Sequence, residues 1–244
     1  MRIMSGAIIF FSCGLFVTGA GAQNVHMGHC TDDPSVPPEN VIAACTVFIT
    51  TEYAEGWRIE YIPRAMVYQA RAYERLGKYA LAEAELKAAT EKFRDYTPAW
   101  EELGELLEKQ NGPGLLMGVL DAMVKANPRD AAVLNSACWI RAEKGEQLET
   151  AISNCNESLA IRPGDVDTLD SRAFVHFREG DFAAAIADAT AALEANPKLE
   201  TSLYVRGLAK LKSGDAAGGN ADIAAAKKFD PKIADTYAAY GVTQ

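Results

Sequence analysis

The residues of this sequence that could bind a metal lie in one short segment near the N-terminus. The segment VHMGHC contains His26, Met27, His29 and Cys30, whose imidazole, thioether and thiol groups are ligands for soft metals. No later segment supplies further ligands at the spacing of a metal site. We therefore expect a flexible leader with a structural cysteine and no metal or other cofactor, with a metal site as the alternative interpretation.

Groups that could carry out catalysis are scarce. The one further histidine, His176, falls on the packed face of a helical pattern and is expected to be structural. The sequence has no nucleophile elbow, no phosphate-binding loop and no HExxH motif. We expect that the protein is not an enzyme.

The charge balance disfavours a nucleic-acid partner. The net charge is -9 and the pI is about 4.9, and no basic face is evident. An acidic balance is compatible with a basic partner but mainly indicates solubility.

Residues 1–22 have the features of a secretory signal peptide. Arg2 precedes an apolar run from Ile8 to Val17, and Ala20-Gly21-Ala22 provides small residues for cleavage. An uncleaved anchor is the alternative, but the apolar run is short for a membrane span. We expect a periplasmic or secreted protein that begins at Gln23 and has no membrane span after cleavage.

The remaining chain is organised around a helix–turn–helix pattern, which is clearest in residues 165–197. Asp165 can accept hydrogen bonds from the free N–H groups of a first helix, and Gly180 can end that helix. Pro197 closes a second, alanine-rich helix. Neither short helix buries its apolar face alone, so neighbouring pairs must stack.

This pattern recurs along the chain. Pro163, Pro197 and Pro231 are separated by 34 residues, and Pro128 lies 35 residues before Pro163. In this period, and in the small residues described below, the chain resembles the tetratricopeptide repeat (TPR) family. The resemblance implies an all-α, right-handed α-solenoid of helix–turn–helix units that binds proteins.

Five units follow from this register, and each has small residues at the family's eighth and twentieth positions, with one exception. The units are 63–96, 97–130, 131–165, 166–199 and 200–230. Leu116 departs from the pattern, since the twentieth position is normally small, and the second unit is therefore degenerate. Residues 23–62 are expected to form a leader loop and an N-terminal capping helix, or half-repeat, and 231–244 a C-terminal capping helix and tail.

Four cysteines remain after the expected processing. An even number in an exported chain suggests disulfides, and four cysteines allow three pairings. The repeat register places Cys138 and Cys155 where the two helices of one unit approach closely, so the resemblance implies this pair. Cys30 and Cys45 would then form the second pair. The alternative is that Cys138 and Cys155 are reduced core residues.

The resemblance also implies a partner-binding groove, because first helices line the inner face of such solenoids at positions five, nine and twelve. The groove residues predicted in this way are Arg71, Glu101, Glu105, Glu108, Asn135, Trp139, Asp170, Phe174, Phe177, Tyr204 and Leu208. The glutamates could instead form a solvated face. The aromatic residues indicate an interaction site, unless they pack on each other or beneath the closing helix.

Two functions fit this interpretation. The first is a non-catalytic scaffold or adaptor of the cell envelope that binds a peptide or protein in its concave groove. The second is a structural subunit of a fixed or self-associating envelope complex. The lysine and asparagine pair with which some relatives clamp a C-terminal carboxylate does not occur at positions five and nine. The partner's identity does not follow from the sequence.

Overall fold

The computed structural model describes residues 29–55 and 59–243, and this part of the chain is helical, with no strand. The predicted signal peptide and most of the leader, including His26 and Met27, lie outside the described residues. The first helices of successive pairs are α2 (Ile62–Arg75), α4 (Thr97–Asn111), α6 (Ala131–Lys144), α8 (Val166–Glu179) and α10 (Glu200–Lys212). Their second helices are α3 (Tyr79–Lys92), α5 (Leu115–Ala126), α7 (Leu148–Ile161), α9 (Phe182–Ala195) and α11 (Ala216–Phe229). Helix α1 (Pro38–Glu55) and a 3-10 turn (Ile59–Tyr61) precede these pairs, and α12 (Ile233–Ala239) follows them.

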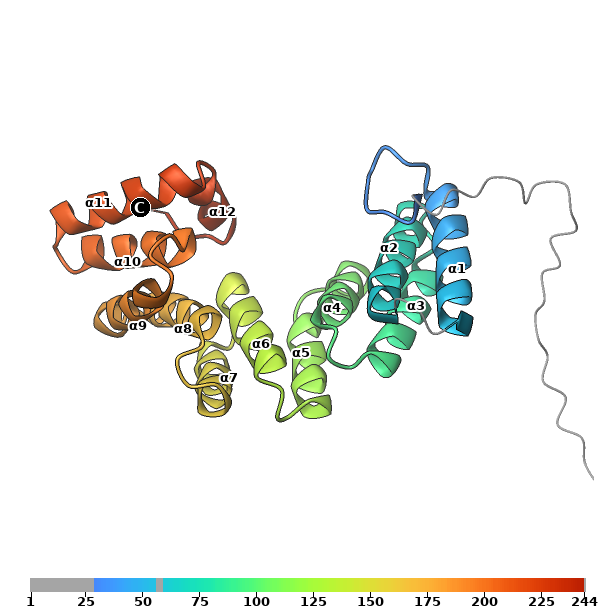
Figure 1. Ribbon diagram of the computed structural model, residues 1–244, viewed down its shortest axis with the longest axis horizontal. Coiled ribbons are helices and arrows are strands. Elements are labelled where there is room, and N and C mark those ends of the chain that lie inside the picture. Colours follow the sequence, from blue (N-terminus) through green and yellow to red (C-terminus); the bar gives the residue numbers. More distant parts are fainter. Residues whose placement is uncertain (1–28, 56–58, 244) are drawn as a thin grey trace, which may run out of the picture.

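The helix pairs stack one after another along a U-shaped path (Figure 1). Helices α1 to α3 form one arm, α10 to α12 form the other, and α5 to α7 lie at the base of the U. This arrangement confirms the predicted all-α solenoid.

Aspartates begin several of these helices, as the sequence indicates for Asp165. Its carboxylate accepts from the backbone N–H of Thr168 at 3.1 Å. Asp130, Asp181 and Asp215 cap α6, α9 and α11 in the same way. Gly180 ends α8 at φ 83°, a conformation that glycine adopts without steric cost.

Small residues allow the two helices of each pair to approach closely. Ala173 of α8 and Ala185 of α9 are fully buried. In the last pair both positions are glycine, and a Cβ on Gly207 would lie only 2.9 Å from the carbonyl oxygen of Gly219. The repeat register is therefore set by backbone contact as well as by side-chain packing.

In the degenerate second unit, a large residue on the second helix packs against a glycine on the first helix. Leu116 is buried at the position where the family has a small residue. It faces Gly104, where an added Cβ would meet Leu116 Cδ1 and lie 3.0 Å from its Cα. The large residue on α5 is accommodated because the opposite residue on α4 has no side chain.

Both predicted disulfides are present. Cys138 of α6 is bonded to Cys155 of α7, within one helix pair. Cys30 is bonded to Cys45 of α1, so the described part of the leader is fastened to the first helix. The Nη2 group of Arg75 also donates to the carbonyl oxygen of Pro34 at 3.0 Å and to that of Val36 at 2.9 Å.

Candidate functional site

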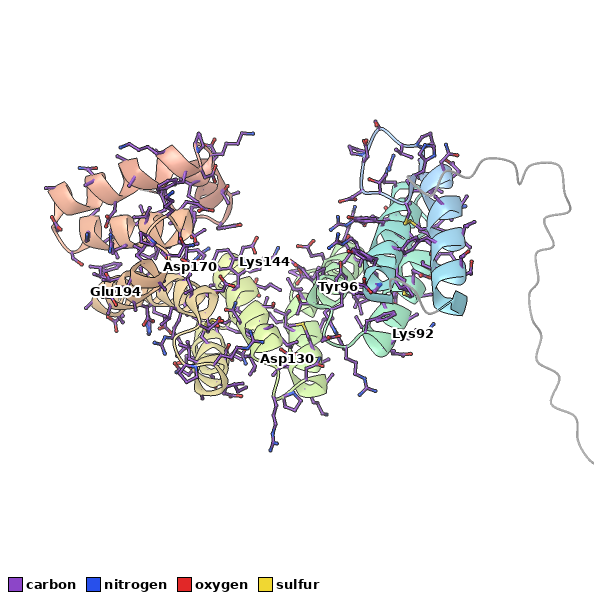
Figure 2. The ribbon with its side chains drawn as sticks, viewed as in Figure 1. Lys92, Tyr96, Asp130, Lys144, Asp170 and Glu194 are labelled. Atoms are coloured by element: carbon purple, nitrogen blue, oxygen red, sulfur yellow. A yellow bond between two sulfur atoms is a disulfide. The ribbon has the colours of Figure 1, made fainter. Side chains whose placement is uncertain are left out.

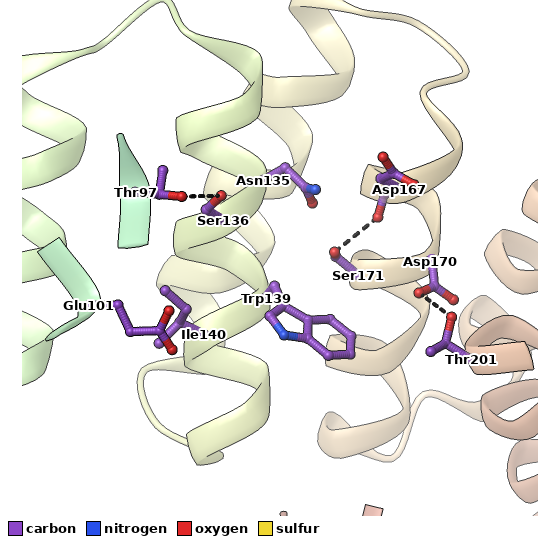
Figure 3. A pocket seen from close by; sticks show the side chains of 10 residues that line it. All are labelled: Thr97, Glu101, Asn135, Ser136, Trp139, Ile140, Asp167, Asp170, Ser171 and Thr201. Atoms are coloured by element: carbon purple, nitrogen blue, oxygen red, sulfur yellow. Dashed lines mark hydrogen bonds between the residues drawn. The ribbon is translucent and has the colours of Figure 1, made fainter. Parts of the chain in front are cut away.

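A cleft of about 360 Å³ opens between α4, α6 and α8 (Figure 3). Polar side chains provide most of its lining. The lining residues are Thr97, Glu101, Asn135, Ser136, Trp139, Ile140, Asp167, Asp170, Ser171 and Thr201. All of these residues except Thr201 come from α4, α6 and α8, which are first helices of their pairs.

Trp139 and Asn135 lie one helical turn apart on α6, and both face the cleft. The indole of Trp139 is partly exposed and extends from α6 toward α8. The Oδ1 atom of Asn135 is shielded from solvent and accepts no hydrogen bond from the described residues. The cleft therefore offers a flat apolar surface beside an unused hydrogen-bond acceptor.

Carboxylates make one side of this surface acidic. Burial raises the pKa of Glu101, and the nearby Glu105 and Glu143 carboxylates raise it further. Burial is also the main cause that raises the pKa of Glu143. Lys144 donates from Nζ to Glu105 at 3.0 Å, and Arg178 lies near Glu143. The three glutamates of this group thus have only two cations near them, Lys144 and Arg178, so this side of the surface has a net negative charge.

Asp170 lies deeper than these glutamates and joins α8 to α10. Its carboxylate accepts a hydrogen bond from Thr201 Oγ1 at 2.7 Å and a second from Ser202 Oγ. Burial raises the pKa of Asp170 to about 6, against the effect of these two hydrogen bonds, which lower it. Lys144 lies at the end of α6, the helix that carries Trp139, and Asp170 lies on α8 (Figure 2).

The structure brings four of the predicted groove residues together in this cleft, namely Glu101, Asn135, Trp139 and Asp170. Glu105 is exposed beside them in its ion pair with Lys144.

Two other predicted groove residues are used for internal contacts instead. Glu108 was expected to line the groove, but its Oε1 accepts from the backbone N–H groups of Gly114 at 2.7 Å and Leu116 at 3.2 Å. It therefore caps the start of α5. The guanidinium of Arg71 donates to Glu102 at 2.8 Å and also to Asp32, which ties α2 to α4 and to the leader.

The prediction that the late aromatic residues form an open groove is wrong. Phe174, Tyr204 and Leu208 are each at most 1% exposed, and Phe177 is 9% exposed. Tyr237 of α12 packs over this cluster, with ring centroids 5.0 Å from Phe174 and 4.9 Å from Tyr204. The closing helix packs inside the curve of the last pairs, so these residues form core in this conformation.

Several cleft residues were missed because the register argument used only positions five, nine and twelve. Asp167 and Thr201 lie at position two of their units, and Ser136 and Ser171 lie at position six. Polar residues repeated at these positions near the starts of first helices were the signal that could have found them.

The described residues contain neither a group of three side chains suited to hold a metal nor a helix long and apolar enough to cross a membrane. Cys30 of the VHMGHC segment is used in a disulfide. His176 is partly buried, with imidazole nitrogens 3.7 Å from the Glu179 and Asp188 carboxylates, in keeping with a structural role.

The stacked helix pairs and the polar cleft on their first helices define an α-solenoid of the repeat class. The tetratricopeptide repeat family model matches residues 63–106, which include α3 and most of α2 and α4. This match and the fold together support a tetratricopeptide repeat protein.

Solved structures of this fold are similar over most of the chain. A thermophilic TPR protein of Thermus thermophilus, TTC0263, is 17% identical with a TM-score of 0.52, covering 73% of this chain and 97% of that one. PilW, described as a widely conserved type IV pilus biogenesis factor, is 15% identical with a TM-score of 0.55, covering 73% and 82%. No curated protein matches the sequence. At these identities the likeness establishes the fold, and protein–protein interaction is the function that the fold implies.

Proposed function

We propose that this protein is a non-catalytic adaptor of the cell envelope, which binds a segment of a protein or peptide in the cleft between α4, α6 and α8. The observation that carries this proposal is the cleft itself, where a partly exposed tryptophan stands beside a free amide oxygen and several carboxylates. Aromatic groups surrounded by polar ones are enriched at protein interfaces.

The chemistry of the cleft favours a partner with basic side chains. Glu101 and Asp167 line it from opposite sides, and the indole of Trp139 lies between them (Figure 3). A lysine or arginine of the partner would meet carboxylates and could also lie over the indole ring.

Two observations support action outside the cytoplasm. Disulfides persist mainly in oxidising compartments, and the structure has two. The N-terminal residues carry the features expected of an export signal. The likeness to PilW, a pilus biogenesis factor by its description, is consistent with an envelope role.

Site-specific photocrosslinking in cells that produce this protein tests the proposal. A photoreactive amino acid at Asp167, which lines the cleft and is accessible there, should give a discrete adduct with a partner. The same amino acid at Glu157, exposed on the second helix α7, should not. Equal adducts at the two positions, or none at Asp167, would contradict binding in the cleft.

A matched pair of substitutions tests the chemistry of the partner. Glu101→Gln combined with Asn135→Ala should reduce the Asp167 adduct severalfold, because it removes a carboxylate and the free acceptor. Glu149→Gln combined with Ser153→Ala, on exposed positions of α7, is the control and should leave the adduct unchanged. An unchanged adduct in the first variant would mean that the partner is not basic.

A further inference from the structure

Helix α12 occupies the concave face next to the open cleft, where its two tyrosines complete an aromatic cluster. Tyr237 is fully buried between Phe174 and Tyr204. Tyr240 lies with its ring centroid 6.2 Å from Trp139 and 6.3 Å from Phe174. The tail thus reaches the residue that also lines the cleft, so the covered surface and the open cleft are continuous.

The contacts of α12 resemble those of a bound peptide. Ile233 and Tyr237 of α12, and Tyr240 directly after its last residue, have the spacing i, i+4 and i+7, which places them on one face. Arg178 of α8 donates to the backbone carbonyl of Glu143 at 2.9 Å and to that of Tyr240, so one guanidinium bridges the solenoid and the tail. This guanidinium also lies 5.1 Å from the ring centroid of Phe174.

The fit of α12 is incomplete, and the helix is short. The hydroxyl of Tyr237 is buried without a hydrogen-bond partner among the described residues, and so is Nε of Arg178. A buried polar group without a partner is destabilising in folded proteins. Seven residues are too few to form a stable helix alone, so α12 depends on this surface for its structure.

We propose that α12 is an intramolecular ligand, and that the aromatic surface beneath it binds a partner segment of the same chemistry once α12 moves away. The surface consists of Phe174, Tyr204 and Arg178, which contact Tyr237 and Tyr240. The partner segment is a short amphipathic helix with an aliphatic residue at i and aromatic residues at i+4 and i+7. This inference rests on the proposed function, because it extends the same concave face toward the C-terminal arm.

The test uses the full-length chain with Tyr237→Ala and Tyr240→Ala, which removes the two rings that hold α12. The probe is a fluorescent synthetic peptide of residues 230–244, measured by fluorescence anisotropy. The double variant should bind this peptide at least about tenfold more tightly than the unsubstituted chain, in which the surface is occupied. The control chain carries Tyr61→Ala and Tyr79→Ala, two exposed tyrosines of the other arm, and should behave like the unsubstituted chain.

Hydrogen exchange on the same variant separates a ligand from a core element. Amides of α12 should lose protection while those of α8 and α10 keep it. If α8 and α10 lose protection as well, α12 is a core element and the proposal is wrong. It is equally wrong if the folded variant does not bind the peptide, or if the unsubstituted chain binds it as tightly. A peptide carrying the same two alanines should not bind, and binding by it would show that the tyrosines are not the recognised groups.

The crosslinking at Asp167 does not depend on α12. Loss of that adduct with retained peptide binding would therefore refute the function proposed for the cleft, and the opposite pattern would refute the role of α12.

Discussion

The Asp170 carboxyl lies between α8 and α10, where burial favours its neutral form. Because its pKa is raised from 3.8 to about 6, the folded state holds this proton at a pH at which the unfolded state has lost it. The contribution of Asp170 to the free energy of unfolding should therefore fall between about pH 4 and pH 6, by on the order of 2–3 kcal/mol. Above about pH 6 it should stay constant.

Urea unfolding of the unsubstituted chain and of Asp170→Asn at several pH values measures this effect. The asparagine keeps one of the two oxygens that accept from Thr201 and Ser202, and it does not titrate in this range. The difference in free energy between the two chains should shift in favour of the variant as the pH rises. Parallel pH profiles would show that Asp170 has an ordinary pKa.

Gly104 is the second residue whose role can be tested singly. Gly104→Ala should destabilise the chain by about 1–3 kcal/mol, because the new methyl group collides with Leu116. This loss would occur although alanine is favoured over glycine in a helix by about 1 kcal/mol.

A double-mutant cycle measured by thermal unfolding isolates the contact. In a Leu116→Ala background the closest contact, with Cδ1, is removed, while the Cα and Cβ of residue 116 stay at 3.0 and 3.3 Å, so Gly104→Ala should cost clearly less than in the unsubstituted chain. If the substitution costs the same in both backgrounds, the two residues do not form the packing unit described above.

The residues of the predicted groove show what the repeat register can and cannot predict. The register placed Glu101, Asn135, Trp139 and Asp170 on one face, and all four line the cleft. It could not predict exposure, since that depends on α12, which lies outside the repeated pattern. Phe174 and Trp139 occupy the same position of successive units, yet Phe174 is fully buried and Trp139 is not.

At the scale of elements, the α6–α7 pair is held covalently. Its disulfide joins cysteines 17 residues apart, and closing a loop of this length in the unfolded chain typically contributes about 3 kcal/mol. Cys138→Ala combined with Cys155→Ala should lower the free energy of unfolding by about that amount under oxidising conditions.

Chemical unfolding and a non-reduced peptide digest check this prediction. The same double substitution measured in the presence of a reductant is the control, and there it should have little effect, because the bond is already open. An unchanged stability under oxidising conditions, or free thiols in the digest, would mean that the pair is reduced in the native protein.

The sequence predicted most of the elements well, for physical reasons that differ from helix to helix. Aspartate caps and glycine ends defined α8 closely, because these residues satisfy the free groups at helix termini. The closing helix was predicted to exist, but its packing over the aromatic residues was only an alternative. Four aromatic contacts with three repeat units determine that position, and no local pattern encodes them.

At the scale of the whole molecule, the helices that line the cleft, α4, α6 and α8, lie between the two arms of the U (Figure 1). Light scattering distinguishes the adaptor from the alternative, a self-associating structural subunit. The protein should scatter as a monomer over a range of concentrations, because the largest aromatic cluster is already covered by its own chain. A defined oligomer would favour the structural subunit.

The placement of the two disulfides has a consequence for how this array would come apart. Repeat arrays fray from their ends, because a terminal unit has only one neighbour. One disulfide fastens the leader to α1, and the other keeps α6 and α7 together as a pair. No disulfide among the described residues joins α12 to the rest of the array, and α12 is held by contacts of Tyr237, Tyr240 and Arg178. The C-terminal end is therefore held by non-covalent contacts alone, and a competing molecule can replace contacts of that kind.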